Sequence, residues 1–237
     1  MLKCGYGKSE ENTKYPTKNE IVNDPKLEID RIFNILFYNQ NKKITEEEFN
    51  NFLECMNDYE NQLYFLIKIS QARTITKEIP EEVLQYLERI FSFILDLFNI
   101  HNISNKEFGI LSLIISLSKT FYYVKGIITK KRIYPYEKLT SKEIFQKKGF
   151  WKEFLEYLIN EERKKKIEEL NNKLTKKQIK YLEADIAFTP MLVIILYMKN
   201  FGFKENEIEI LINDSFKKYN ISEELKDTVN LYIKANK

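Results

Sequence analysis

Residues 80–98 have the sequence PEEVLQYLERIFSFILDLF, in which an apolar side chain recurs at every third or fourth position. An α-helix has about 3.6 residues per turn, so this spacing places the apolar side chains on one broad face. Pro80 followed by two glutamates is a typical helix start. The stretch therefore predicts an amphipathic helix that buries this face.

The segments around this helix repeat with the same period, and three of them begin with the residues of a helix N-cap. The cap signals are Asp24-Pro25, Thr45 with Glu48, and Ser104 with Glu107. In the last two pairs the spacing is that of a capping box, in which each residue satisfies a free backbone N–H near the other. A further helix is expected over 58–72. The helix over 108–123 is apolar on most sides and is expected at the centre of a bundle.

Residues 124–149 form the longest interruption of the helical pattern. They contain two glycines, a proline and many lysines, but also aromatic and apolar side chains that are expected to pack against the helices. Loops of this length inside a compact domain are uncommon unless they are functional or disordered. A short helical turn is expected at 141–146, and the 3.6-residue period resumes at Phe150.

The sequence thus predicts an all-α fold. We expect a single helical domain over 25–237, with about eight or nine helices in two packed sub-bundles. The first sub-bundle is expected at 25–123 and the second at 150–237, joined by a long packed connector at 124–149. A flexible N-terminal lead-in is expected at 1–24, where the sequence is polar and shows no period.

Composition excludes several classes of protein. Six glycines and five prolines in 237 residues provide too few turns for a β-sandwich or barrel, and 43% hydrophobic residues are too many for a disordered chain. The net charge of +3, with both signs interspersed, predicts no nucleic-acid partner. Cys4 and Cys55, with no apolar leader and no apolar run of membrane-spanning length, favour a cytoplasmic location.

No residue pattern typical of catalysis, cofactor binding or metal binding is present. His101 is the single histidine, and no serine or cysteine is spaced to pair with it. Calcium-loop spacings fail at the ligand positions, and capping boxes account for the glutamates concerned. We therefore expect no enzyme, no cofactor and no metal. An enzyme would require a polar pocket that contains His101 or converging carboxylates.

Two features leave alternatives open. The basic stretch 147–166 contains Arg163 and the three lysines after it, which could contact an anionic membrane. Glutamates on both sides reduce its field, so a solvated helix face is the competing interpretation. Trp151, the sole tryptophan, could either anchor the second half in the core or form an exposed contact for a partner.

The middle of the chain carries a recognisable series of motifs. They are SQAR at 70–73, LSKTFYY at 117–123, RIYPYEKL at 132–139, IF at 144–145, GFWKEFLEY at 149–157 and EER at 161–163. This series resembles the SET-binding-factor helical domain. That domain occurs in large exchange factors for Rab GTPases, in the SET-binding-factor pseudophosphatases of the myotubularin group and in short stand-alone proteins. The resemblance extends over about residues 28–236.

The resemblance implies a non-catalytic protein–protein interaction or adaptor module in vesicle trafficking or in small-GTPase or kinase signalling. It identifies no partner. Four aromatic positions that match the family are expected to be structural anchors, and the surface around them could form the partner site. These positions are Tyr134, Tyr136, Phe150 and Trp151. It also implies that Arg73 and Arg163 form buried or bridging charge pairs. The alternative function is a peripheral membrane-binding module that uses the stretch 147–166.

Overall fold

The computed structural model of the chain describes residues 24–39, 42–99, 102–127, 129–169 and 176–235. The elements in these ranges are α1 (Pro25–Phe37), α2 (Glu46–Cys55), α3 (Tyr59–Ala72), α4 (Glu81–Asp96), α5 (Asn105–Ser118), β1 (Tyr123–Lys125), β2 (Lys131–Ile133), α6 (Tyr136–Leu139), α7 (Glu143–Gln146), α8 (Lys148–Glu169), α9 (Lys176–Asn200), α10 (Glu205–Tyr219) and α11 (Glu223–Ala235). Apart from its last residue, Asp24, the predicted N-terminal lead-in lies outside the described residues.

The N-caps expected from the sequence form as local hydrogen bonds. The Asp24 carboxylate accepts from a backbone N–H of the first turn of α1. Thr45 and Glu48 form a reciprocal capping box at the start of α2, and Ser104 and Glu107 form another at the start of α5. Each box satisfies two backbone N–H groups that the helix itself leaves without an acceptor, so these starts depend only on residues three apart.

The all-α prediction is confirmed for the described residues, where nine helices have ten residues or more. The short helical turn expected at 141–146 is present as α7, but the predicted connector also contains the antiparallel hairpin β1–β2 and the four-residue helix α6, which were not expected. Helix α5 also ends at Ser118 rather than at residue 123. Strand β1 begins a few residues later at Tyr123 and Val124, an aromatic and a β-branched residue, which both favour a strand.

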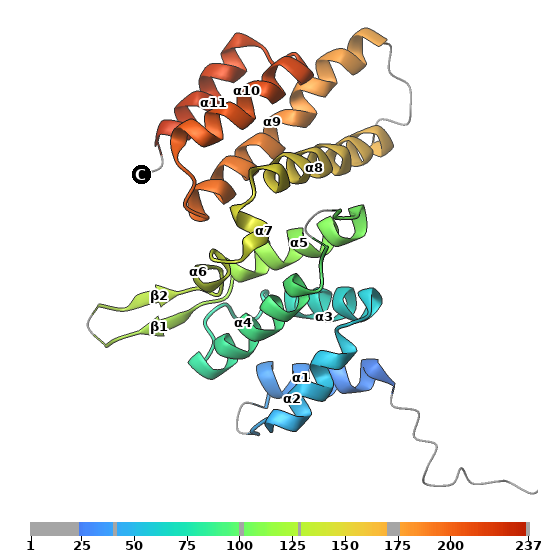
Figure 1. The fold of residues 1–237 in the computed structure, drawn as a ribbon, viewed down its shortest axis with the longest axis vertical. Coiled ribbons are helices and arrows are strands. Elements are labelled where there is room, and N and C mark those ends of the chain that lie inside the picture. Colours follow the sequence, from blue (N-terminus) through green and yellow to red (C-terminus); the bar gives the residue numbers. More distant parts are fainter. Residues whose placement is uncertain (1–23, 40–41, 100–101, 128, 170–175, 236–237) are drawn as a thin grey trace, which may run out of the picture.

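The helices stack in layers along the longest axis of the molecule (Figure 1). Helices α1 and α2 lie at one end, α10 and α11 at the other, and the hairpin β1–β2 projects sideways from the middle. Helix α1 packs on α2 and α3, α3 packs on α5, α5 on α8, α8 on α9, and α9 on both α10 and α11. Contacts therefore run mainly between neighbouring layers.

One continuous hydrophobic core passes through all the layers. Helix α5 lies in the middle of the stack, as its apolar sequence predicts, with α3 and α4 on one side and α8 on the other. The joint between α5 and α8 is where the two predicted sub-bundles meet. Most of the residues singled out by the sequence lie at or near this joint.

Candidate functional site

Trp151 lies in the core of the joint and is fully buried, with 0% of its surface exposed. Its indole Nε1 donates a hydrogen bond to the carbonyl oxygen of Phe145 in α7, at 2.9 Å. The ring also contacts Phe201 and Phe203 between α9 and α10, with centroids 5.4 and 6.0 Å away. Trp151 therefore ties α7 and the α9–α10 turn to α8, and of the two interpretations left open by the sequence the structure favours the core anchor.

Phe150 is the second buried anchor, and it belongs to a row of rings that joins α5 to α8. Phe108 of α5 stacks on Phe150, Phe154 and Tyr157 of α8, with ring centroids 5.6–6.1 Å apart. A Cβ atom at Gly109 would lie only 3.3 Å from the Tyr157 hydroxyl oxygen. The glycine therefore permits the close approach of the two helices on which this stacking depends.

Tyr134 and Tyr136 are half-buried and lie on the connector, as the sequence predicts. Their rings contact each other with centroids 5.8 Å apart, and Tyr134 also contacts Tyr122, 5.7 Å away. Burial raises the pKa of the Tyr136 hydroxyl, so it remains protonated at neutral pH. These two tyrosines anchor the base of the hairpin to the helices on either side of it.

Lys119 is a buried cation at the joint that the sequence analysis did not single out. Its side chain lies between two rings, with Nζ 4.4 Å from the centroid of Tyr197 in α9 and 5.7 Å from that of Tyr136. Nζ is buried, and no hydrogen-bond acceptor of the described residues contacts it. Burial lowers the pKa of this amine from 10.5 to about 8. The signal in the sequence is a single lysine in the run LSKTFYY, which contains no other charged residue.

The two arginines implied by the resemblance have different environments. Arg163 of α8 donates two hydrogen bonds to the carboxylate of Glu183 in α9, at 2.8 and 2.6 Å, and so forms a bridging pair. Arg73 is exposed at the C-cap of α3, and no ion pair joins it to another residue in the described ranges. The charge pair for which Arg73 was a candidate is therefore absent from the described part of the chain. Helix α3 ends there at the surface, where solvent replaces a partner.

The Arg163–Glu183 pair is expected to contribute about 1 kcal/mol to stability, because it is bidentate and both side chains are only 28% exposed. A double-mutant cycle with Arg163→Ala and Glu183→Ala, followed by urea unfolding, measures this coupling. The exposed pair Lys164–Glu161 serves as a control and should give a coupling near zero. Equal couplings in the two cycles would contradict a special role for the bridge.

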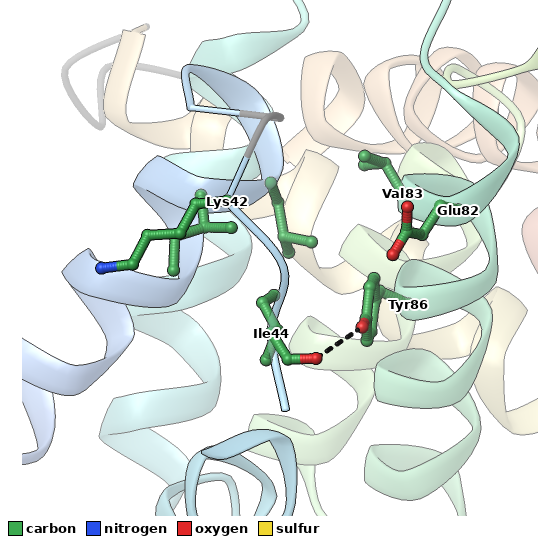
Figure 2. A pocket seen from close by; sticks show the side chains of 7 residues that line it. Lys42, Ile44, Glu82, Val83 and Tyr86 are labelled. Carbon is green, nitrogen blue, oxygen red and sulfur yellow. Dashed lines mark hydrogen bonds between the residues drawn. The ribbon is translucent and has the colours of Figure 1, made fainter. Parts of the chain in front are cut away.

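A small pocket lies between α4 and the segment that joins α1 to α2. Figure 2 shows the Tyr86 hydroxyl facing the carbonyl oxygen of Ile44, to which it donates a hydrogen bond of 3.3 Å. The cavity has a volume of about 20 Å³, with Lys42, Glu82 and Val83 among its lining residues. A volume of this size holds about one water molecule, whereas small-molecule sites measure about 300 Å³ or more. The pocket therefore offers no ligand site.

The other chemical candidates find little support in the described part of the chain. No group of three or more His, Cys, Asp and Glu side chains gathers there as a metal site would require. No helix of that part is both long and apolar enough to cross a membrane. His101 lies outside the described residues.

Four of the seven cations in the basic stretch 147–166 form ion pairs. Lys147 bonds to Glu143, Lys148 to Glu207, Arg163 to Glu183 and Lys164 to Glu161, at 2.6–3.1 Å. Each of these carboxylates cancels much of the field of its partner, which favours a solvated helix face. The stretch is therefore a weaker candidate for membrane contact than its sequence suggests.

Comparison of the chain with protein-family models, with curated proteins and with solved structures finds no match. The resemblance to the SET-binding-factor helical domain therefore stays a prediction from the motifs between residues 70 and 163.

Proposed function

We propose that this chain is a non-catalytic interaction module, an adaptor that binds a protein partner on its stacked helices. The observation that carries the proposal is the layered architecture of Figure 1, in which contacts run mainly between successive layers. In repeat proteins, layers that are stacked in this way form extended surfaces that bind partners. The resemblance described above adds the expectation of a cytoplasmic role in vesicle trafficking or in small-GTPase or kinase signalling.

Two of the aromatic anchors do not themselves provide the binding surface. Trp151 and Phe150 are buried, so a partner cannot reach them in the folded protein. The surface must therefore come from side chains that are exposed. Isolated apolar residues on a surface are normal, but apolar residues on neighbouring helices of an end layer are candidates for docking.

The outer face of the last layer offers such a surface. Ile210 of α10 is 65% exposed and Leu231 of α11 is 67% exposed, while Ile208, Val229 and the other core residues of these helices are buried. Both helices pack on α9 and on each other, so residues opposite their buried faces point away from the stack. In stacked repeat proteins the end layers normally have a polar outer face. Exposed apolar side chains on an end layer could therefore be covered by a further helix that packs on it. The proposed partner is an amphipathic helix that adds to the stack.

Purification of the tagged full-length protein from its own cells, with wild type and variants in parallel, tests this proposal. The variant Ile210→Glu/Leu231→Glu should lose a protein that the wild type retains, because two carboxylates would be buried at the contact. Leu27→Glu is the matched control, since Leu27 is 66% exposed on α1 at the other end of the stack. Circular dichroism checks that each variant is folded. The same set of proteins on all three baits would contradict the proposal.

A further inference from the structure

The hairpin β1–β2 is the one described element that leaves the helical stack. Its strands pair antiparallel, with Tyr123 opposite Ile133, Val124 opposite Arg132 and Lys125 opposite Lys131. Gly126 and Lys130 adopt left-handed backbone conformations, with φ of 86° and 41°, on the two sides of the turn. Figure 1 shows the hairpin projecting sideways from the middle of the molecule.

The base of the hairpin is held firmly by the body of the protein. Tyr122 donates a backbone hydrogen bond to Lys77 and accepts one from Ile79, both of 2.9 Å, in the segment between α3 and α4. The Arg132 guanidinium lies over the Tyr122 ring, 4.6 Å from its centroid. Together with the Tyr134 contacts described above, these interactions give the hairpin a defined direction relative to the stack.

The tip of the hairpin combines an apolar side chain with positive charge. Ile127 is 93% exposed, the highest value among the large exposed hydrophobic residues. Three exposed lysines flank it, namely Lys125, Lys130 and Lys131. None of these three lysines forms an ion pair with another residue that the structure describes, whereas four of the seven cations in 147–166 do.

The nearest acidic groups lie at the base, away from the tip. Glu78 forms a backbone bridge with Tyr122, and Glu81 interacts with the Tyr123 hydroxyl. No acidic residue occurs between 108 and 136. The outer part of the hairpin therefore carries several positive charges without acidic neighbours, and these charges surround the exposed side chain of Ile127.

We infer that the hairpin attaches the protein to the surface of an anionic lipid bilayer. Ile127 enters the boundary between headgroups and acyl chains, and the three lysines contact lipid phosphates and carboxylates around it. The bilayer interface accommodates both parts, because it offers an apolar layer directly beneath a negatively charged one. A soluble polyanion such as a nucleic acid would use the cations but leave the isoleucine in water.

This attachment is separate from the proposed docking of a partner on α10 and α11. A hairpin in the middle of the stack leaves the outer face of the last layer free. The membrane-binding alternative drawn from the sequence thus acquires a different site, at Lys125, Ile127, Lys130 and Lys131 instead of 147–166.

Co-sedimentation of the full-length protein with vesicles tests the inference. The protein should bind vesicles that contain phosphatidylserine and phosphatidylcholine, bind vesicles of phosphatidylcholine alone weakly, and be released by moderate salt. Lys130→Gln/Lys131→Gln should lower the partition coefficient about 25-fold, at about fivefold for each cation. Ile127→Ser should lower it several-fold although the charge is unchanged.

Lys152→Gln/Lys165→Gln removes two exposed lysines from the stretch 147–166 and is the matched control, which should bind like the wild type. Loss of binding in this control alone would place the contact in that stretch and overturn the inference. No binding by the wild type, or equal binding to neutral vesicles, would also overturn it. An unchanged Ile127→Ser variant would show a purely electrostatic contact with any polyanion and exclude insertion into a bilayer.

Discussion

Replacing Trp151 with alanine is expected to lower the free energy of unfolding by about 3–5 kcal/mol, the usual cost of removing a fully buried large aromatic side chain. The cavity would open between α7, α8 and the α9–α10 turn, where the Trp151 ring contacts Phe145, Phe201 and Phe203. The carbonyl of Phe145 would also lose its hydrogen-bond donor. Urea unfolding followed by far-UV circular dichroism measures the change.

Trp151→Phe is the matched variant, because it keeps an aromatic ring but removes the indole N–H. We expect it to cost about 1–3 kcal/mol, from the lost hydrogen bond and the smaller ring. The order of stability should therefore be wild type, Trp151→Phe, Trp151→Ala. An alanine variant that unfolds like the wild type but no longer binds a partner would show that Trp151 is a contact residue and would contradict its place in the core.

Replacing Lys119 with methionine is expected to raise stability at neutral pH, by about 1–2 kcal/mol. The folded state buries the ammonium group without a hydrogen-bond acceptor, and this burial lowers its pKa to about 8. The contacts with the rings of Tyr136 and Tyr197 recover part of the cost. Methionine fills a similar volume, keeps contact with both rings and carries no charge.

The same substitution should change how stability depends on pH. The amine has an ordinary pKa of 10.5 in the unfolded chain and about 8 in the folded one, so between these values the unfolded state binds more protons. The cost of Lys119 is therefore complete below pH 8 and decreases as the pH rises above it. Burial raises the pKa values of Tyr136 and Tyr197, so both rings stay neutral in this range.

Urea unfolding between about pH 7 and pH 9.5 tests both expectations. Wild-type stability should rise with pH relative to Lys119→Met, and the gap between the two should narrow. Lys106→Met is the control, because Lys106 is exposed and lies over the ring of Tyr59, 5.2 Å from its centroid. A Lys119→Met variant that is less stable than wild type at pH 7 would mean that the ring contacts outweigh the cost of burial.

The parts of the fold that depend on local sequence were predicted well. Thr45 and Glu48 form their capping box because the two residues are one helical turn apart, whatever the rest of the chain does. The helix expected from residues 80–98 is α4, whose buried face follows the apolar spacing. The spacing of apolar residues at about 3.6 positions can be recognised from the sequence alone, and it was sufficient to predict the all-α fold class.

The hairpin and the environments of Arg73 and Lys119 were not predicted. Strands of three residues leave too short a pattern to recognise, and Tyr123 was assigned to the preceding helix. Arg73 and Arg163 each follow an apolar helical stretch, yet only Arg163 faces a carboxylate on a neighbouring helix. Whether a charged side chain finds a partner depends on a second element, which the spacing along one helix does not reveal.

The sequence by itself determined where the helices begin and which faces they bury, because caps and amphipathic periods act within a few residues. Only the tertiary structure decided that Trp151 is enclosed, that Lys119 lies between the rings of Tyr136 and Tyr197, and that Ile127 projects into solvent. These properties depend on the packing of segments distant in the chain. Whether a side chain is buried, and which residue it pairs with, depends on the neighbouring helices, which take their positions only when the layers pack together.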